Sequence, residues 1–189
     1  MVNDTPAASD DRSNGTWRDV ASPQAQADLD ELLSAALGAA MEHLEKNGEF
    51  YPFAMSVDGE PTIDSAGEPT AASNQAVAPD VDIVFADPAA LGEQPEPEAV
   101  LAELRRVLAV RAENENRTVA QRATAIVLYV VVPEFGDAVR VDLEHAEGVQ
   151  LMVLAPVKGK GKSRKRTFEY GDLRLLPGQR HIWLSLIHI

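Results

Sequence analysis

The feature that most constrains the fold is a nearly continuous apolar run over residues 123–132. Almost every position in this run is apolar, so a strand formed by it could turn neither face to water. The run is too short for a membrane span, which needs about 18 apolar residues. It therefore predicts a central strand buried on both faces, and the rest of the chain must supply the covering elements.

Two amphipathic helices are expected to pack with this strand. For the first, Ser22 is a suitable N-cap, Pro23 suits the first helical position, and Asn47-Gly48 provides a left-handed stop. The second follows the Pro-rich residues 94–97 and frays near residues 114–116. Apolar residues recur at spacings of three and four in both. These are Leu29, Leu32, Leu33, Ala36, Leu37, Ala40, Met41 and Leu44 in the first helix, and Val100, Leu101, Leu104, Val107 and Leu108 in the second.

The remaining strands are expected to be short and linked by tight turns. Asp58-Gly59 predicts a two-residue hairpin that joins a strand over 50–57 to one over 61–63. Further strands are expected over 81–85, 139–144, 149–156 and 167–173. In the 139–144 strand apolar and charged residues alternate, which predicts one face in the core and a water-facing row of Arg140, Asp142 and Glu144.

This order of elements predicts the fold class. We expect one α+β domain over residues 22–183, with a mainly antiparallel sheet of about five to six strands and two principal helices. Nine side chains from both helices and the strands are expected to be buried together: Leu33, Leu37, Leu44, Leu104, Leu108, Ile126, Leu128, Val141 and Val153.

Four segments are expected to lie outside the packed domain. Residues 1–21 have the composition of a disordered acidic tail, and residues 64–80 and 158–166 that of flexible loops. The last six residues, 184–189, read as the in-frame translation of CTGTCTCTTATACACATC, which resembles a transposon adapter. We therefore expect this end to be an adapter-derived artefact and the natural chain to be truncated near Trp183.

Composition narrows the compartment and the partners. The chain has no cysteine, which excludes disulfides and thiolate zinc sites and favours a reducing cytoplasm. The formal net charge of −13 argues against general nucleic-acid binding. This charge is uneven: 20 acids and 3 bases in residues 1–100 give −17, and the remaining residues give +4.

The segment G-E-F-Y-P-F, from Gly48 to Phe53 directly after the first helix, resembles a family of small uncharacterised bacterial proteins. The similarity extends through residues 168–171 to residues 177–183, and so covers most of residues 27–183. The resemblance implies a compact domain and no particular chemistry. The order of elements is also similar to that of roadblock-type and profilin-like modules, which implies nothing about function.

The same segment is the first candidate binding site. Glu49, Phe50, Tyr51 and Phe53 gather aromatic rings, a hydroxyl and a carboxylate at the start of an expected edge strand. Such rings could form a platform for a ligand or a partner. Alternatively, they simply seal the first helix against the sheet.

A basic loop is the second candidate binding site. It has six cations in nine residues, namely Lys158, Lys160, Lys162, Arg164, Lys165 and Arg166. Gly161-Lys162-Ser163 resembles the end of a phosphate-binding loop, but Pro156 stands where that motif needs glycine and a strand follows. A flexible cationic loop that meets anionic partners remains, with a merely solvated loop as the alternative.

No metal, cofactor or catalytic site is expected. Asp80, Asp82 and Asp87 lack the loop pattern of a calcium site, so an acidic, solvated loop is the default interpretation. His43, His145 and His181 lack the helical spacing of a zinc site, and no serine lies in a nucleophile elbow.

The functional expectation is a cytoplasmic interaction or regulatory module without catalytic activity, which binds a protein partner and no membrane. The alternative is an enzyme that acts on an anionic or phosphorylated small molecule through the basic loop, together with His145 or Tyr51. A deep polar pocket that encloses these groups would favour the enzyme.

Overall fold

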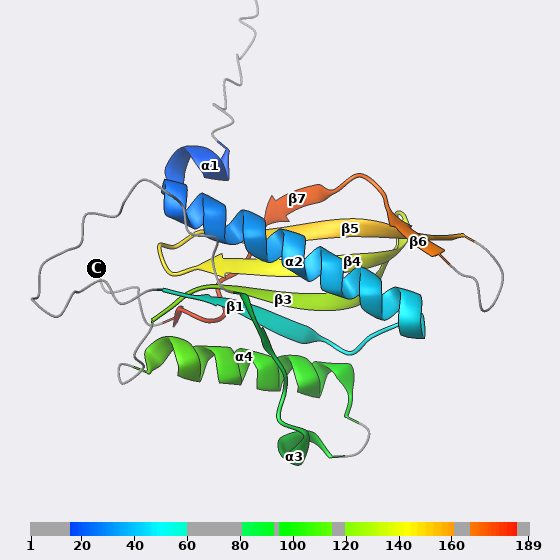
Figure 1. Cartoon of the computed structure of the whole chain (residues 1–189), viewed down its shortest axis with the longest axis horizontal. Coiled ribbons are helices and arrows are strands. Elements are labelled where there is room, and N and C mark those ends of the chain that lie inside the picture. The colour runs from blue at the N-terminus through cyan, green and yellow to red at the C-terminus, as the bar shows by residue number, and fades with distance from the viewer. Residues whose placement is uncertain (1–15, 60–80, 93–94, 115–119, 161–166, 185–189) are drawn as a thin grey trace, which may run out of the picture.

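The computed structural model describes residues 16–59, 81–92, 95–114, 120–160 and 167–184. Its centre is an antiparallel sheet in the order β2-β1-β3-β4-β5-β6, and β7 also pairs with β5 (Figure 1). The strands are β1 (Phe53–Asp58), β2 (Val81–Val84), β3 (Gln121–Val132), β4 (Gly136–His145), β5 (Gln150–Lys160), β6 (Thr167–Tyr170) and β7 (Arg174–Pro177). The helices are α1 (Trp17–Val20), α2 (Pro23–Asn47), α3 (Pro88–Leu91) and α4 (Pro97–Glu113). The α+β fold class is thereby confirmed.

The two long helices cover opposite faces of the sheet (Figure 1). Successive residues of a strand point to opposite faces, and β1 divides in this way: Phe53 and Met55 pack with α2, whereas Ala54 packs with α4. In β3, likewise, Val127 packs with α2 and Ile126 with α4. The strand predicted to be buried on both faces is therefore the layer between two cores.

This division corrects one expectation about the core. The nine residues expected to pack together belong to two separate clusters on the two faces of the sheet. Leu44, Val141 and Val153 are buried on the α2 side, and Leu104, Leu108 and Ile126 on the α4 side. The other three, Leu33, Leu37 and Leu128, are only partly buried.

Both long helices begin and end close to the predicted positions. Ser22 caps α2, because its hydroxyl accepts a hydrogen bond from the backbone N–H of Ala25 at 3.1 Å. Gly48 ends the helix with a φ of 82°, and its N–H donates to the carbonyl of Leu44. In α4, Glu98 lies in the first turn and Arg111 in the last, as the helix dipole favours.

The expected hairpin at Asp58-Gly59 is wrong. Over Ala54–Val57, β1 pairs with β2 on one side and with β3 on the other, so no edge is left for a hairpin partner. The Gly59 N–H donates to the carbonyl of Ala120, the residue directly before β3. Residues 61–63 lie outside the described residues.

Three short elements were not expected: α1, α3 and β7. Residues 17–20, predicted within a disordered tail, form α1, and the ring of Trp17 packs against the core under α2. Because Arg18 donates two hydrogen bonds to Asp30, α1 is held to α2. The strand β7 follows the strand expected over 167–173 and pairs with Leu151–Leu154 of β5.

The water-facing row predicted in β4 is only partly correct. Arg140 and Asp142 are partly exposed and pair with each other, but Glu144 is 4% exposed. Residues 181–183 cover it: the Glu144 carboxylate accepts the backbone N–H of His181 at 2.7 Å and that of Ile182 at 3.1 Å. Ile182 and Trp183 are buried in the α4-side core.

Of the residues after Trp183, which the sequence analysis interprets as adapter-derived, the structure describes only Leu184. The Leu184 side chain is 64% exposed. Residues 185–189 lie outside the described residues, so the adapter interpretation stays a prediction. Among the described helices, none has the length and apolar character needed to cross a membrane.

Candidate functional site

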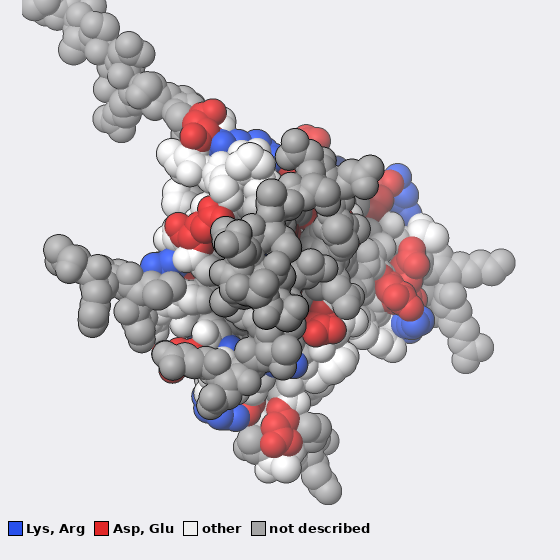
Figure 2. Space-filling model, turned by 60° about the vertical axis from the view of Figure 1, so that its left-hand side comes forward, with Lys and Arg blue, Asp and Glu red and all other residues white. Residues whose placement is uncertain are grey.

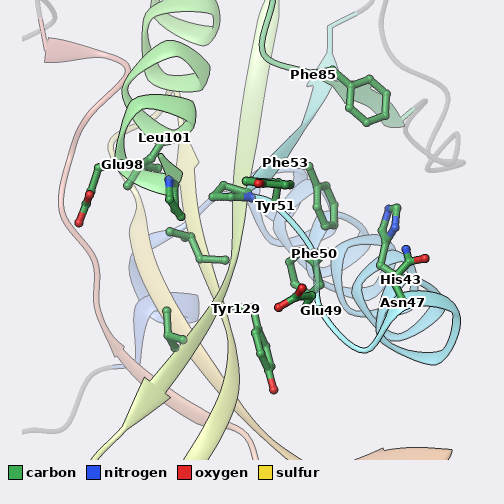
Figure 3. A pocket seen from close by; sticks show the side chains of 14 residues that line it. His43, Asn47, Glu49, Phe50, Tyr51, Phe53, Phe85, Glu98, Leu101 and Tyr129 are labelled. Carbon is green, nitrogen blue, oxygen red and sulfur yellow. The ribbon is translucent and has the colours of Figure 1, made fainter. Parts of the chain in front are cut away.

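A pocket formed by the described residues has a volume of about 950 Å³ and includes the predicted aromatic segment (Figure 3). Four parts of the chain line it: the end of α2, the segment from Glu49 to Phe53, the start of α4, and the far part of β3. Phe85, which follows β2, also lines it. The lining residues are His43, Asn47, Glu49, Phe50, Tyr51, Pro52, Phe53, Phe85, Pro97, Glu98, Leu101, Leu128, Tyr129 and Val130.

The pocket lies where β1 begins. Gly48 turns the chain out of α2, and Pro52 has no N–H to donate to a sheet partner. The pairing of β1 with β3 therefore starts at Phe53 and Val127, although β3 continues to Val132. The segment before Phe53 leaves the sheet, and the side chains of Leu128, Tyr129 and Val130 on β3 line the pocket beside it.

One wall of the pocket is a cluster of aromatic rings. The ring centroids of Phe50 and Phe53 are 5.5 Å apart, and those of Phe50 and Tyr129 are 6.0 Å apart, in tilted arrangements. The imidazole of His43, on α2, lies 5.6 Å from the ring of Phe53. Phe53 is buried and Phe50 is partly buried against α2. These two rings therefore also pack the first helix against the sheet, as the alternative interpretation of the segment expected.

The rim of the pocket is aromatic and acidic. Tyr51 is 58% exposed and Phe85 67% exposed, so both rings remain available to a ligand. In Figure 3, Glu49 and Glu98 lie on different elements, one after α2 and the other on α4. Among the described residues, neither carboxylate has a hydrogen bond or ion pair.

The basic loop does not contribute to this pocket in the part of the chain that the structure describes. Lys158 and Lys160 were expected in a flexible loop, but they belong to β5, paired with Glu169 and Thr167 of β6. Both lysines are exposed, and the Lys160 ammonium forms an ion pair with Glu169 at 2.7 Å. Lys162, Arg164, Lys165 and Arg166 lie outside the described residues.

Charge of one sign does not dominate the described surface in Figure 2. On that face, acidic and basic side chains form small separate groups, several of which lie next to each other. Three described ion pairs join side chains close in sequence: Glu42 with Lys46, Glu103 with Arg106, and Arg140 with Asp142.

The acidic residues considered for metal binding do not form a site in the described structure. Asp82 lies on β2, and the carboxylate of Asp87 accepts the backbone N–H of Ala89 at the start of α3. Asp80 is outside the described residues. Within the described ranges, no three His, Asp or Glu side chains gather closely enough to hold a metal ion.

A buried polar cluster is the feature that the sequence analysis missed. Asp28, on α2, is 0% exposed, and its carboxylate accepts hydrogen bonds from Arg122 at 2.8 and 2.9 Å and from Gln24 at 2.7 Å. His145, 2% exposed, lies 3.2 Å from the same carboxylate. The sequence contained a signal for this cluster, because Asp28 lies four residues before Leu32 and is therefore on the buried side of the helix.

The hydrogen bonds around His145 fix its role. Its Nδ1 accepts the backbone N–H of Glu147 at 3.2 Å, which assigns the ring hydrogen to Nε2, and Nε2 donates to Asp28. Burial alone would raise the pKa of Asp28, but hydrogen bonds from His145, Arg122 and Gln24 outweigh it and lower the pKa to about 2. Because the imidazole is buried and both its nitrogens are engaged, this cluster joins α2 to β3 and β4 and offers no free base.

A second polar contact holds the last described residues. Arg105, on α4, lies 3.3 Å from the Nε2 atom of His181. Burial and the nearby Arg105 charge lower the pKa of His181, so its ring favours the neutral form. With Glu144 bound to the backbone of the same residue, this segment closes the α4-side core.

Comparisons with protein-family models, with curated proteins and with solved structures found no match for this chain. Any functional assignment must therefore come from the pocket and its chemistry.

Proposed function

We propose that this chain is a non-catalytic interaction module of the cytoplasm, which binds a protein partner through the aromatic pocket. One observation carries the proposal: aromatic side chains from α2, β3 and the segment before β1 converge on a pocket of about 950 Å³. Ligand-binding pockets measure about 300–1,000 Å³ and are lined mainly by apolar and aromatic groups. Two of the rings, Tyr51 and Phe85, remain more than half exposed. The absence of cysteine supports a reducing compartment.

The described pocket offers little for catalysis. A nucleophile needs a base within hydrogen-bonding reach and a third group that orients the base. Among the described residues, Tyr51 forms no hydrogen bond with His43, the one histidine in the lining, and the ring of His43 packs against Phe50 and Phe53. His145, which the enzyme alternative would use, is buried against Asp28.

The enzyme alternative also expects an anionic substrate, and the pocket does not suit one. Its lining contains two glutamates and neither lysine nor arginine. The described lysines of the basic loop, Lys158 and Lys160, are absent from the lining. We therefore advance the interaction module and no second function.

The proposal can be tested with peptides selected against the immobilised full-length chain from a random displayed library. Synthetic copies of the selected peptides are titrated into the isotopically labelled protein, and binding is followed by amide chemical shifts. We expect the shifts to concentrate at residues that line the pocket. Tyr51→Ala and Phe85→Ala should each weaken binding by about tenfold, the effect of losing one exposed aromatic contact at a small interface.

The matched control is Val110→Ala, which removes an apolar side chain 53% exposed on α4 and absent from the pocket lining. This variant should bind as the parent does. Selected peptides that bind all three variants equally would place the binding surface elsewhere and overturn the proposal.

A further inference from the structure

The charge of the pocket lining favours one kind of ligand side chain over another. Of its 14 residues, Glu49 and Glu98 are acidic and none is Lys or Arg. The two acids reach the pocket from separate elements, since Glu49 follows α2 and Glu98 belongs to the first turn of α4. An anionic side chain that entered would meet two carboxylates and no cation of the lining, whereas a cation would be attracted by both.

The two carboxylates of the pocket lining differ from two acids on α2 and α4 that are paired within the chain. On α2, Glu42 pairs with Lys46, and on α4, Glu103 pairs with Arg106 at 2.7 Å. Glu49 and Glu98, by contrast, have no ion pair among the described residues. Both acids of the pocket lining therefore lack a cationic partner among the described residues, as Glu31 and Glu45 of α2 also do.

The exposed rings of the pocket, like its two carboxylates, lack a cationic partner among the described residues. Elsewhere in the chain, an arginine lies over an aromatic ring: Arg18 over Trp17 at 4.4 Å, and Arg174 over Phe135 at 4.7 Å. No described Lys or Arg lies over Tyr51 or Phe85, although both rings are more than half exposed. The face of an aromatic ring attracts a cation, and the attraction grows where water is partly excluded.

Resting on the proposed function, we infer that the pocket accepts the cationic side chain of a lysine or arginine of the partner. Lys and Arg combine an apolar stem with a charged head. The stem matches the apolar part of the lining, such as Leu101 and Leu128, and the head matches the exposed rings and the two carboxylates. The partner segment therefore presents a lysine or arginine side chain to the pocket.

The test uses four peptides, acetyl-Ala-Leu-X-Leu-Ala-amide with X as lysine, arginine, norleucine or glutamate. Each is titrated into the full-length chain, and binding is followed by amide chemical shifts of the pocket residues. Norleucine keeps the apolar stem of lysine and lacks the charge. We expect the lysine and arginine peptides to bind about tenfold more tightly than the norleucine peptide, and the glutamate peptide to bind most weakly.

The variant Glu49→Gln/Glu98→Gln separates charge from shape. It should narrow the difference in affinity between the lysine and norleucine peptides, although the rings still attract the cation, and should leave norleucine binding unchanged. The control is Glu31→Gln, an exposed acid of α2 outside the pocket lining, which should bind all four peptides as the parent does. Added salt should weaken the lysine peptide more than the norleucine peptide.

The outcomes distinguish this inference from the proposed function. If the norleucine peptide binds at the pocket as tightly as the lysine peptide, the inference of a cationic ligand is wrong. The proposal of an interaction module would still stand. Failure of all four peptides and of every selected peptide to shift pocket residues would overturn both. Self-association of the chain that disappears in the double variant would identify a second copy as the occupant, and would overturn the assignment to a separate partner.

Discussion

Arg122 donates two hydrogen bonds to the Asp28 carboxylate, from Nε at 2.8 Å and from Nη2 at 2.9 Å. The contact joins β3 to α2 across 94 positions of sequence, with the carboxylate fully buried and the guanidinium side chain 27% exposed. Two parallel hydrogen bonds between a guanidinium and a carboxylate are among the strongest interactions that charged side chains form. With His145 on the same carboxylate, the first turns of α2 are fixed to two strands of the sheet.

The first prediction concerns this contact. Asp28→Asn removes the charge that Arg122 and His145 surround, and it takes from Arg122 the carboxylate that accepts two of its hydrogen bonds. We expect the free energy of unfolding to fall by about 3 kcal/mol, the lower end for breaking a buried pair, because Arg122 keeps some contact with water. Urea denaturation at neutral pH measures this.

Asp30→Asn is the matched control, since Asp30 lies two residues later and also accepts two hydrogen bonds from an arginine. Both partners of that pair are about half exposed. We expect this substitution to cost less than about 1 kcal/mol. Equal losses in the two variants would contradict the structural role of Asp28.

The second prediction concerns pH. The folded-state pKa of Asp28, about 2, is below its ordinary value of 3.8. A carboxyl whose pKa is lower in the folded state stabilises the fold above the unfolded pKa, and that stabilisation is lost as the pH falls through the folded pKa. Between about pH 5 and pH 2, the difference in unfolding free energy between the parent and Asp28→Asn should narrow by about 2 kcal/mol. A difference that stays constant over this range would show that the pKa of Asp28 does not change on folding.

The third prediction concerns the core on the α4 side. Leu104 is 0% exposed, and Leu104→Ala should lower the free energy of unfolding by about 2–5 kcal/mol through lost burial and a cavity. Val110→Ala, on the same helix but 53% exposed, should cost less than about 1 kcal/mol. Thermal unfolding of both variants checks this, and a parental melting temperature for Leu104→Ala would mean that α4 does not cover the sheet.

The fourth prediction concerns Gly178, after β7. A Cβ added there would lie 2.5 Å from the backbone nitrogen of Leu151, so the backbone must move. We expect Gly178→Ala to destabilise the fold by about 1–3 kcal/mol and to loosen residues 181–183. The measurement is hydrogen exchange at Ile182 together with thermal unfolding. Unchanged exchange would show that this close approach is not required.

The fifth prediction concerns the basic loop. Replacing Lys160, Lys162 and Lys165 with Ser should abolish salt-sensitive retention on a polyanion column if the loop recognises anionic partners. The Lys160–Glu169 pair is exposed, so its loss should lower the stability by less than about 1 kcal/mol. If neither retention nor stability changes, the loop is only a solvated turn.

The sequence by itself determined the elements that depend on neighbouring residues. The ends of α2 follow from Ser22 and Gly48, because a capping hydroxyl and a left-handed glycine act within one turn of the helix. The apolar run in β3 and the stripe of α4 likewise carry their periodicity locally. From these alone, the α+β class and a strand covered on both faces could be predicted.

Only the tertiary structure decided which segments meet. The partner of β1 is β2 in place of a hairpin strand at 61–63, and the Glu144 side chain is buried because residues 181 and 182 return to it. The aromatic segment could be singled out in the sequence, but Phe85, Glu98 and Tyr129 reach the same pocket from other elements. Such contacts join residues distant in sequence, and their free energy depends on the packing of the whole domain, which no local pattern encodes.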